Sequence, residues 1–287
     1  MNEKSHMQFK DRCPKRLLIT PRKCDLIRPK AVTETPLPPM LASPLYNGPP
    51  IQVPGEREAH LWLVSLAVKP EDLSDFKSIL SRDERDRAER FREKRHAQRY
   101  VVARGALRSL LGAYLGLGAD ELQFAYDSSG KPRLADERTS LGFNVSHSGD
   151  WALLGFTGCH KIGVDLEWVQ GEIEFVDLAK RFFSPNEIQK LFSLPADQQR
   201  QAFYSGWTRK EAFLKARGEG LSRGLDRVEV SLAPDEPAAI IEASGELEAC
   251  RAWTIQHLSP LPEYIGAAAV DAGNVAFRCF GWDADSQ

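Results

Sequence analysis

Asp165 and Glu167 stand two residues apart in the segment 162–168, which we predict to be a strand. Side chains two apart on a strand share a face, so the carboxylates lie together while Val164 and Leu166 point the other way. Adjacent carboxylates repel each other and need a cation, and their hard oxygens suit Mg²⁺. A surface strand with two acids is the alternative. The apolar surroundings indicate burial, which is costly for unpaired acids and so favours a metal site.

A second set of charges lies between Gly206 and Gly218, where we predict a helix. Trp207, Glu211 and Lys215 fall at i, i+4 and i+8 and therefore lie along one side. Taken alone, such an acid–base pair is also common on solvated helix faces. Beside the two strand carboxylates, the helix carboxylate would be a third metal ligand, and the ammonium could reach a phosphate. Such a metal site implies a phosphate-bearing substrate.

Candidate phosphate-binding residues occur earlier in the chain. Gly130-Lys131-Pro132 is a turn that displays a lysine, Ser146-His147-Ser148 is a strand end rich in donors, and Arg99 lies on a long helix. Each signal alone is weak, because turn lysines are usually exposed and a lone histidine is more often structural. No Cys or Ser in these motifs has a base partner arranged for covalent catalysis, so direct transfer is favoured.

Periodicity predicts the elements that must position these residues. Ser81 and Glu84 form a capping box at the start of a helix, and Gly116 and Gly118 mark the end of the next one. We predict helices at 82–93, 95–116, 175–183, 184–192 and 206–218. We predict strands at 61–68, 122–126, 141–146, 151–156 and 162–168. Four later alternating runs, at 227–232, 252–257, 264–270 and 275–280, are expected to form an antiparallel sheet.

The order strand, helices, strands occurs twice, which predicts an α+β fold of two similar lobes with a cleft between them. We place the lobes at residues 56–160 and 161–287. Residues 1–55 hold ten of the 18 prolines and nine Lys/Arg against four Asp/Glu, and we expect a flexible extension. A targeting segment and a start codon set too far upstream (Met7 or Met40 being the alternatives) remain open for this region.

Composition excludes several classes of protein. The formal net charge is −2, so no global field draws the chain to nucleic acid or to a membrane. No apolar run approaches the length of a membrane span, and no secretory signal follows the first Met. The five cysteines are scattered without a CxxC pair, which indicates free thiols in a reducing cytosol rather than zinc ligands. We therefore expect a cytoplasmic protein.

Five segments, taken together and in order, resemble the signatures of the Sfp-type 4′-phosphopantetheinyl transferases. They are Gly130-Lys131-Pro132 and residues 143–148, 163–167, 181–184 and 207–215. The resemblance covers roughly residues 59–271. It implies a pseudo-dimeric α+β monomer that binds coenzyme A between its lobes. It also implies transfer of 4′-phosphopantetheine to a serine of an apo acyl or peptidyl carrier protein, with release of adenosine 3′,5′-bisphosphate.

The resemblance also implies a role for individual residues. Glu211 would be the base for the carrier serine as well as a metal ligand, and Lys215 would stabilise the leaving bisphosphate. The implied Mg²⁺ ligands are Asp165, Glu167 and Glu211. The implied coenzyme A contacts are Arg87, Arg99, Lys131, Pro132, Ser146, His147, Asp165 and Lys215, with Arg99 and Arg87 near the 3′-phosphate. Glu84 departs from the pattern, since family members carry a basic residue there, and this implies a weaker or rearranged 3′-phosphate clamp.

Two other classes stay open at this point. One is a different Mg²⁺-dependent phosphotransferase or pyrophosphate-cleaving enzyme, with water or a small alcohol as acceptor. The other is a non-catalytic module that binds coenzyme A or a carrier protein, although a retired site has no physical need for clustered acids. Whether the carrier serves fatty acid, polyketide or nonribosomal peptide synthesis does not follow from the sequence.

Overall fold

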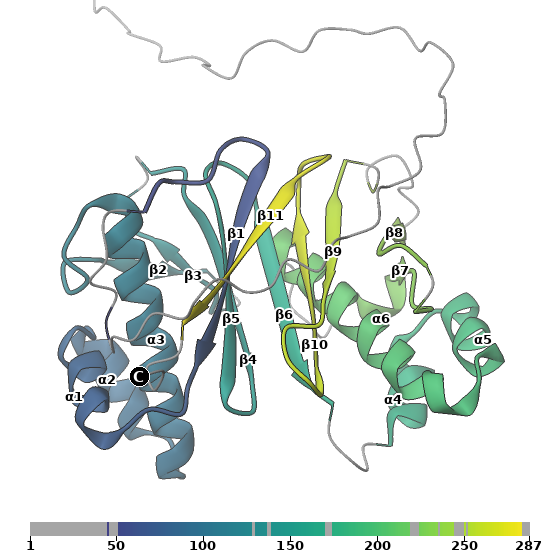
Figure 1. Cartoon of the computed structure of the whole chain (residues 1–287), viewed down its shortest axis with the longest axis horizontal. Coiled ribbons are helices and arrows are strands. Elements are labelled where there is room, and N and C mark those ends of the chain that lie inside the picture. Colours follow the sequence, from purple (N-terminus) through teal and green to yellow (C-terminus); the bar gives the residue numbers. More distant parts are fainter. Residues whose placement is uncertain are drawn as a thin grey trace, which may run out of the picture. The chain divides into compact units, whose positions relative to one another are not determined.

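Helices and strands both occur along the chain, which is a mixed α+β protein (Figure 1). The computed structural model describes residues 45, 51–127, 130–136, 139–169, 174–218, 224–234, 236–243, 250 and 252–282. All elements named below belong to the unit Pro36–Gln287. Within these ranges, no helix combines the length and apolar character needed to cross a membrane. Most of the predicted extension, residues 1–55, lies outside the described residues.

The first sheet has four strands in the order β11, β1, β5, β4. They span Ala276–Trp282, Glu58–Ser65, Trp151–Thr157 and Gly142–Ser148. β5 pairs antiparallel with both β1 and β4, whereas β11 pairs parallel with β1. Seven of the eight residues of β1 are buried, because both of its faces are covered. This explains why the strand reads as a continuous apolar run rather than as an alternation.

The prediction that the run at 275–280 joins an antiparallel sheet with the other tail strands is wrong. This run is β11, which lies beside β1 and pairs with it in parallel. Its aromatic residues explain the preference: Phe280 stacks on Trp62 with centroids 4.6 Å apart, and Trp282 is 1% exposed. Alternation marks a half-buried strand but does not identify the sheet that it joins.

The second sheet is antiparallel and has the order β6, β10, β9. These strands span Ile162–Trp168, Tyr264–Val270 and Thr254–Leu258. They confirm the predicted strand at 162–168 and the antiparallel pairing of the runs at 264–270 and 252–257. The run at 227–232 instead forms the short strand β7 (Val228–Val230), which pairs with β8 (Ile240–Ala243) in a separate two-stranded sheet.

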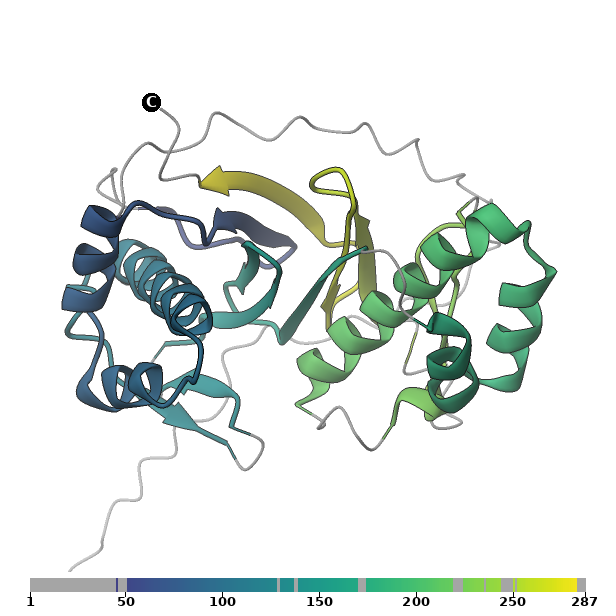
Figure 2. The ribbon, with the colours of Figure 1, turned by 90° about the horizontal axis from the view of Figure 1, so that it is seen from below.

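Helices cover the outer face of each sheet (Figures 1 and 2). On the first sheet these are α1 (Pro70–Ser78), α2 (Arg82–Glu89) and α3 (Lys94–Leu115), of which the sequence did not predict α1. Trp62, Val64 and Leu154 face these helices. Leu61, Leu63 and Leu153 face the second sheet and form a core with Val164 and Leu166. The inner faces of the two sheets therefore pack against each other. A small hairpin of β2 (Phe124–Tyr126) and β3 (Pro132–Leu134) follows α3.

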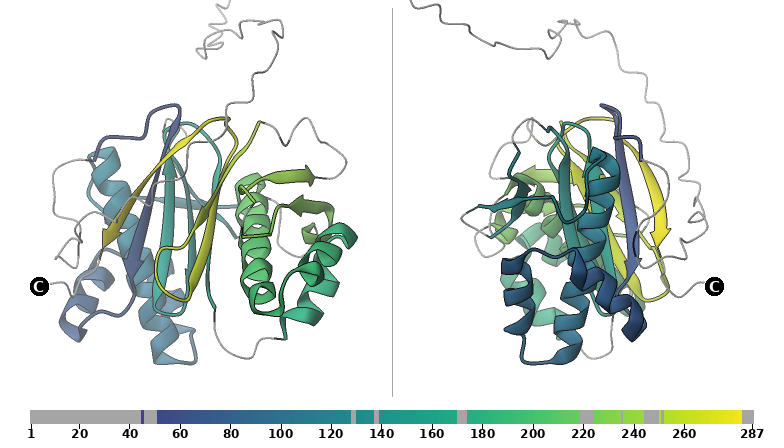
Figure 3. Two further views of the ribbon diagram at one scale, coloured as in Figure 1. Left: turned by 45° about the vertical axis from the view of Figure 1, so that its right-hand side comes forward. Right: turned by 90° about the vertical axis from the view of Figure 1, so that its left-hand side faces the viewer.

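The second sheet is covered by α6, a helix of 22 residues that spans Ala196–Arg217 (Figure 3). The predicted helix 206–218 is its second half, and the predicted end is confirmed by Gly218, which adopts φ 76°. The first ten residues were missed because they are mostly polar. Two shorter helices precede it, α4 (Phe175–Phe182) and α5 (Pro185–Ser193). At the start of α5, Ser184 and Glu187 form a reciprocal capping box.

The two sheets meet where β4 runs beside β6. Three backbone N–H groups of β6 donate to side-chain oxygens of β4. The bonds are Val164 N to Asn144 Oδ1 (2.9 Å), Leu166 N to Ser146 Oγ (3.3 Å) and Trp168 N to Ser148 Oγ (3.0 Å). The partners are twenty residues apart in every case, so the strands run in the same direction in a fixed register. We call this row of three bonds the side-chain ladder.

Gly163 allows β6 to approach α6 closely. A Cβ at this position would collide with the backbone O of Ala212 and the backbone N of Ala216. We predict that Gly163→Ala lowers the free energy of unfolding by about 1–3 kcal/mol, because α6 must shift away from the strand. Urea titration followed by circular dichroism measures this change.

Gly273→Ala is the matched control, since nothing lies within 4 Å of a Cβ there. This control should stay within about 0.5 kcal/mol of the parent protein. Equal stability of both variants would show that α6 does not depend on the close approach at Gly163.

Candidate active site

Asp165 lies at the centre of a group of charges on β6 and α6. It is 3% exposed. Its Oδ1 accepts hydrogen bonds from Ser146 Oγ (2.9 Å) and Lys215 Nζ (2.6 Å). Its Oδ2 is buried and has no hydrogen-bond partner in the described structure. A buried carboxylate oxygen without a partner is costly, so this atom would be stabilised by a cation.

Glu167 lies two residues further along the same face of β6. Its Oε2 accepts from Ser148 Oγ (3.1 Å), and the nearby Trp207 side chain slightly lowers the pKa of the carboxyl group. Burial raises the pKa of Glu167 to about 7, and the nearby charge of Asp165 adds to the rise. The indole ring itself packs edge-on against Phe182, with centroids 5.5 Å apart. Trp207 thus supports α6 by packing and also lies near a carboxylate on β6.

Glu211 is the third carboxylate of the group and is 4% exposed. Its pKa is raised to about 7, mainly by burial and also by the charges of Asp165 and Glu167, while Lys215 opposes the rise. The structure therefore brings together the four residues that the sequence placed on a strand face and a helix side. A carboxyl group with a pKa near neutrality can accept a proton at physiological pH.

The donor set suits a divalent cation, although a finished metal site is not formed. Among the described residues, no three His, Cys, Asp or Glu side chains converge closely enough to hold a metal ion. The three carboxylates offer only hard oxygen ligands, and one of their oxygens is buried without a partner. Lys215 Nζ pairs with Asp165 and partly neutralises the group. These residues fit Mg²⁺ chemically, provided that the side chains draw together.

Cationic and imidazole groups flank the carboxylates. Lys131 Nζ donates to the backbone O of Lys215, so the turn before β3 contacts the last turns of α6. The pKa of Lys131 is lowered, mainly by burial. His147 is exposed at the end of β4, and its pKa is lowered by partial exclusion of water and by the charges of Lys215 and Arg99. The ammonium groups of Lys131 and Lys215 favour a bound anion, while the lowered pKa of His147 favours its neutral form.

Arg99 and Arg87, predicted near a 3′-phosphate, do not contact the carboxylates. Arg99 binds Asp150 through Nη2 at 2.7 Å, and Arg95 binds the other oxygen of Asp150 at 2.8 Å. The Arg87 guanidinium lies over the Tyr100 ring, 5.4 Å from its centroid. Pro132, a predicted contact of coenzyme A, begins β3 directly after Lys131 and pairs with Tyr126 across the hairpin.

Glu84, where the resemblance led us to expect a basic residue, has a structural role. This side chain is 1% exposed and accepts hydrogen bonds from Arg104, Arg108 (2.6 Å) and the backbone N of Ser81 (2.9 Å). Burial alone would raise the pKa of Glu84, but the two guanidinium groups and these bonds lower it. Glu84 therefore joins α2 to α3. The sequence predicted its capping bond and missed its two arginine partners, which lie 20 and 24 residues later.

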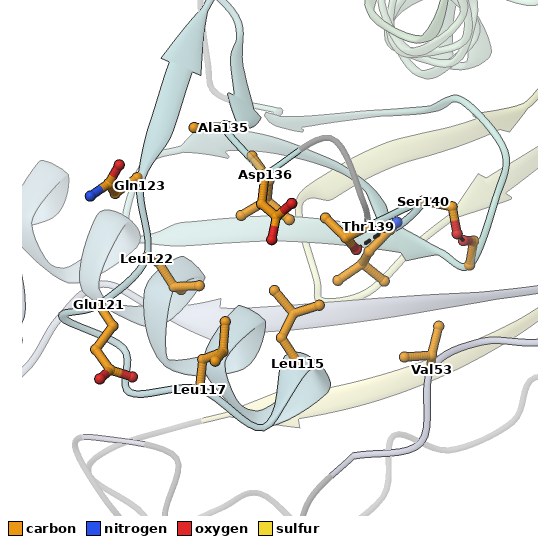
Figure 4. A pocket seen from close by; sticks show the side chains of 13 residues that line it. Val53, Leu115, Leu117, Glu121, Leu122, Gln123, Ala135, Asp136, Thr139 and Ser140 are labelled. Carbon is orange, nitrogen blue, oxygen red and sulfur yellow. Dashed lines mark hydrogen bonds between the residues drawn. The ribbon is translucent and has the colours of Figure 1, made fainter. Parts of the chain in front are cut away.

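One cavity lies away from the carboxylate group, and its described lining does not suit a phosphate. It has a volume of about 870 Å³ and shares no lining residue with the carboxylate group (Figure 4). Leu115, Leu117 and Leu122 form part of its wall, and its charged lining residues are Glu121 and Asp136. A phosphate ligand would be repelled there. A second cavity of about 630 Å³ is lined by Arg95, Arg99 and Asp150 among others.

Comparison with known proteins identifies the family. Residues 161–269 match the model of the 4′-phosphopantetheinyl transferase superfamily, and residues 67–157 match that of the N-terminal 4′-phosphopantetheinyl transferase region. The 4′-phosphopantetheinyl transferase HetI of Nostoc sp. is 40% identical over 227 residues, which cover 78% of this chain and 90% of HetI. Sfp of Bacillus subtilis is 34% identical over 170 residues, which cover 59% of this chain and 74% of Sfp. The chain belongs to the Sfp-type 4′-phosphopantetheinyl transferases.

The buried bonds of Glu84 predict that a basic residue cannot replace it. Glu84→Lys would leave Arg104 and Arg108 without their carboxylate and would bury a third cation beside them. We expect a loss of at least about 3 kcal/mol in the free energy of unfolding, measured by chemical denaturation. Asp86→Lys, at an exposed position of the same helix, should change it by less than about 0.5 kcal/mol. A Glu84→Lys protein as stable as the parent would refute the structural role.

The raised pKa of Glu211 predicts a pH-dependent stability in the absence of metal. Folding disfavours the ionised carboxylate, so stability present below the ordinary pKa of 4.5 is lost as the pH rises through about 7. Gln cannot ionise. Glu211→Gln should therefore be more stable than the parent by about 1–3 kcal/mol at pH 8 and nearly equal to it at pH 4.

Urea titrations in EDTA at the two pH values measure this difference. Asp197→Asn, at an exposed position of α6, should follow the parent at both. A Glu211→Gln variant that is less stable than the parent at pH 8 would contradict the assigned direction.

Proposed function

We propose that the chain transfers the 4′-phosphopantetheine group of coenzyme A to a serine of an apo acyl or peptidyl carrier protein. One observation carries the proposal: Asp165, Glu167, Glu211 and Lys215 form a single charge group beside Lys131 and His147, in a member of the transferase family. Phosphoryl-type transfer depends on charge neutralisation and alignment, which such a group provides. The second product is adenosine 3′,5′-bisphosphate.

Glu211 is the base that accepts the proton of the carrier serine. A serine hydroxyl is a poor nucleophile until a base takes its proton, and a base with a pKa near 7 is matched to neutral pH. Lys215 lies one turn further along α6 and is directed toward Asp165. Its ammonium can stabilise the bisphosphate as the pyrophosphate bond breaks. Lys215 and Glu211 thus serve opposite ends of the same transfer.

Asp165, Glu167 and Glu211 are the residues that would hold Mg²⁺. When bound, the ion supplies positive charge that neutralises the pyrophosphate oxygens. The partnerless Oδ2 of Asp165 and the raised pKa of both glutamates support this assignment, since a cation would relieve all three.

Lys131 and His147 are the leading candidates for contact with the phosphates of coenzyme A. Ser146 is also proposed as a contact, but its hydroxyl donates its single proton to Asp165. It must rotate before it can donate to a phosphate. Pro132 fixes the turn that carries Lys131. Arg99 and Arg87 are proposed near the 3′-phosphate, where Arg99 would exchange Asp150 for the ligand.

We propose that residues 56–160 and 161–287 form the two lobes of a pseudo-dimer, with the substrate cleft along their junction. The side-chain ladder supports this arrangement, because it joins β4 of one half to β6 of the other. β11 crosses between the halves and would tie them together. We further propose a cytoplasmic monomer, which the scattered cysteines and the low net charge support.

Glu211→Gln should abolish labelling of an apo carrier protein by coenzyme A and Mg²⁺ while preserving the circular dichroism spectrum. The substitution keeps the shape of the side chain and removes its basicity. Intact-protein mass spectrometry measures the fraction of carrier modified over a time course. Asp197→Asn, on the exposed start of α6, is the control and should label at the parental rate. Labelling by Glu211→Gln within tenfold of the parent would refute the assignment of the base.

The same assay separates the other two classes. A phosphotransferase or pyrophosphate-cleaving enzyme would release the bisphosphate without adding mass to the carrier. A non-catalytic binding module would bind coenzyme A in a calorimetric titration and release no product. A panel of apo carrier proteins from fatty acid, polyketide and peptide synthesis would identify the acceptor.

A further inference from the structure

Each carboxylate on β6 has its own serine on β4. Ser146 Oγ donates to Asp165 and Ser148 Oγ donates to Glu167, and the partners are nineteen residues apart in both cases. The same two hydroxyls accept backbone N–H groups of β6 in the side-chain ladder. The register between β4 and β6 therefore aligns the two strands and also determines the orientation of the carboxylates.

The hydrogen-bonding capacity of a hydroxyl explains how Ser148 restricts the orientation of the Glu167 carboxylate. A serine hydroxyl has one proton to donate and two lone pairs to accept with. Ser148 Oγ accepts from Trp168 N at 3.0 Å, so its proton points away from that strand N–H and toward Glu167 Oε2. A donor held by the backbone cannot follow a moving side chain. The rotamer of Glu167 is therefore fixed from β4.

Asn144 takes part in the side-chain ladder but does not contact a carboxylate. Its Oδ1 accepts from Val164 N at 2.9 Å, as the serine oxygens do further along. The described structure gives Asn144 no carboxylate partner, because the residue before Val164 is Gly163. Asn144 and Ser148 thus share the task of joining the strands, and only Ser148 also contacts a proposed ligand.

We propose that Ser148 is a positioning residue for the transfer reaction: its hydroxyl, fixed by Trp168 N, holds the Glu167 carboxylate in the orientation that binds the divalent cation. This inference rests on the proposed function. Partners of metal ligands commonly change metal affinity 10- to 100-fold when removed, because the ligand then samples other rotamers. Ser148 would act through Glu167 and would not touch the substrate itself.

Metal binding without turnover provides the first test. Mg²⁺ is titrated calorimetrically into the full-length enzyme saturated with coenzyme A, with no carrier present. Ser148→Ala should bind Mg²⁺ about tenfold more weakly. Ser148→Thr keeps a hydroxyl and should recover to within about threefold of the parent. Asn144→Ala should lower the unfolding midpoint as Ser148→Ala does, yet bind Mg²⁺ within about twofold of the parent.

The second test asks whether Ser148 acts through Glu167. The kcat/KM for carrier labelling is measured for Ser148→Ala, Glu167→Gln and the double variant. Ser148→Ala should cause about a tenfold loss in the parent and less than a twofold loss in the Glu167→Gln background. Losses that multiply would show an independent, structural role and overturn the proposal. Ser148→Cys, whose thiol is a weak donor, takes the place of Ser148→Ala if the alanine variant does not fold.

The outcomes separate this proposal from the function on which it rests. If the parent enzyme labels carriers and Ser148→Ala binds Mg²⁺ as tightly as the parent, only the positioning role fails. Equal weakening by Asn144→Ala and Ser148→Ala would also overturn it, since the ladder alone would then be responsible. A parent enzyme that neither labels a carrier nor binds Mg²⁺ would overturn both proposals.

Discussion

The side-chain ladder between β4 and β6 is the contact on which the rest of the site depends. Backbone ladders within a sheet tolerate many side chains, but this junction is made by the side chains of Asn144, Ser146 and Ser148 themselves. A shift in the register between β4 and β6 would separate Ser146 and Ser148 from Asp165 and Glu167. The acceptor oxygens that hold the two sheets together therefore also determine where the carboxylates point. The Oγ atoms of Ser146 and Ser148 each join the strands and contact a carboxylate, whereas Asn144 Oδ1 only joins the strands.

The periodicity of strands and helices was enough to predict which site residues share a face of one element. Asp165 and Glu167 share a face because strands alternate, and Glu211 and Lys215 share a side because helices repeat every 3.6 residues. The partners of Glu84 could not be predicted, because Arg104 and Arg108 meet it only after α2 packs on α3. The bond from Ser148 to Glu167 was missed for the same reason, since it requires the register between two strands. For β11, the sequence showed an alternating pattern but did not indicate that the strand pairs with β1.

The negative charges of the carboxylate group are only partly balanced by the protein itself. Two of its members have a pKa near 7, and Asp165 shares one oxygen with Lys215 while the other has no partner among the described residues. Folding brings these charges together at a cost in free energy, and the packing of α6 on β6 offsets that cost. A cation would relieve the repulsion among these carboxylates.

The pairing of β11 with β1 has a consequence for how the protein is made. The strand that completes the first sheet is synthesised about two hundred residues after the strand it joins. During translation, β1 therefore waits with one edge open and with Trp62 lacking its stacking partner Phe280. Open strand edges are sites of aggregation, and contacts between residues so distant in sequence form slowly. The first sheet can therefore be completed only after β11 has been synthesised.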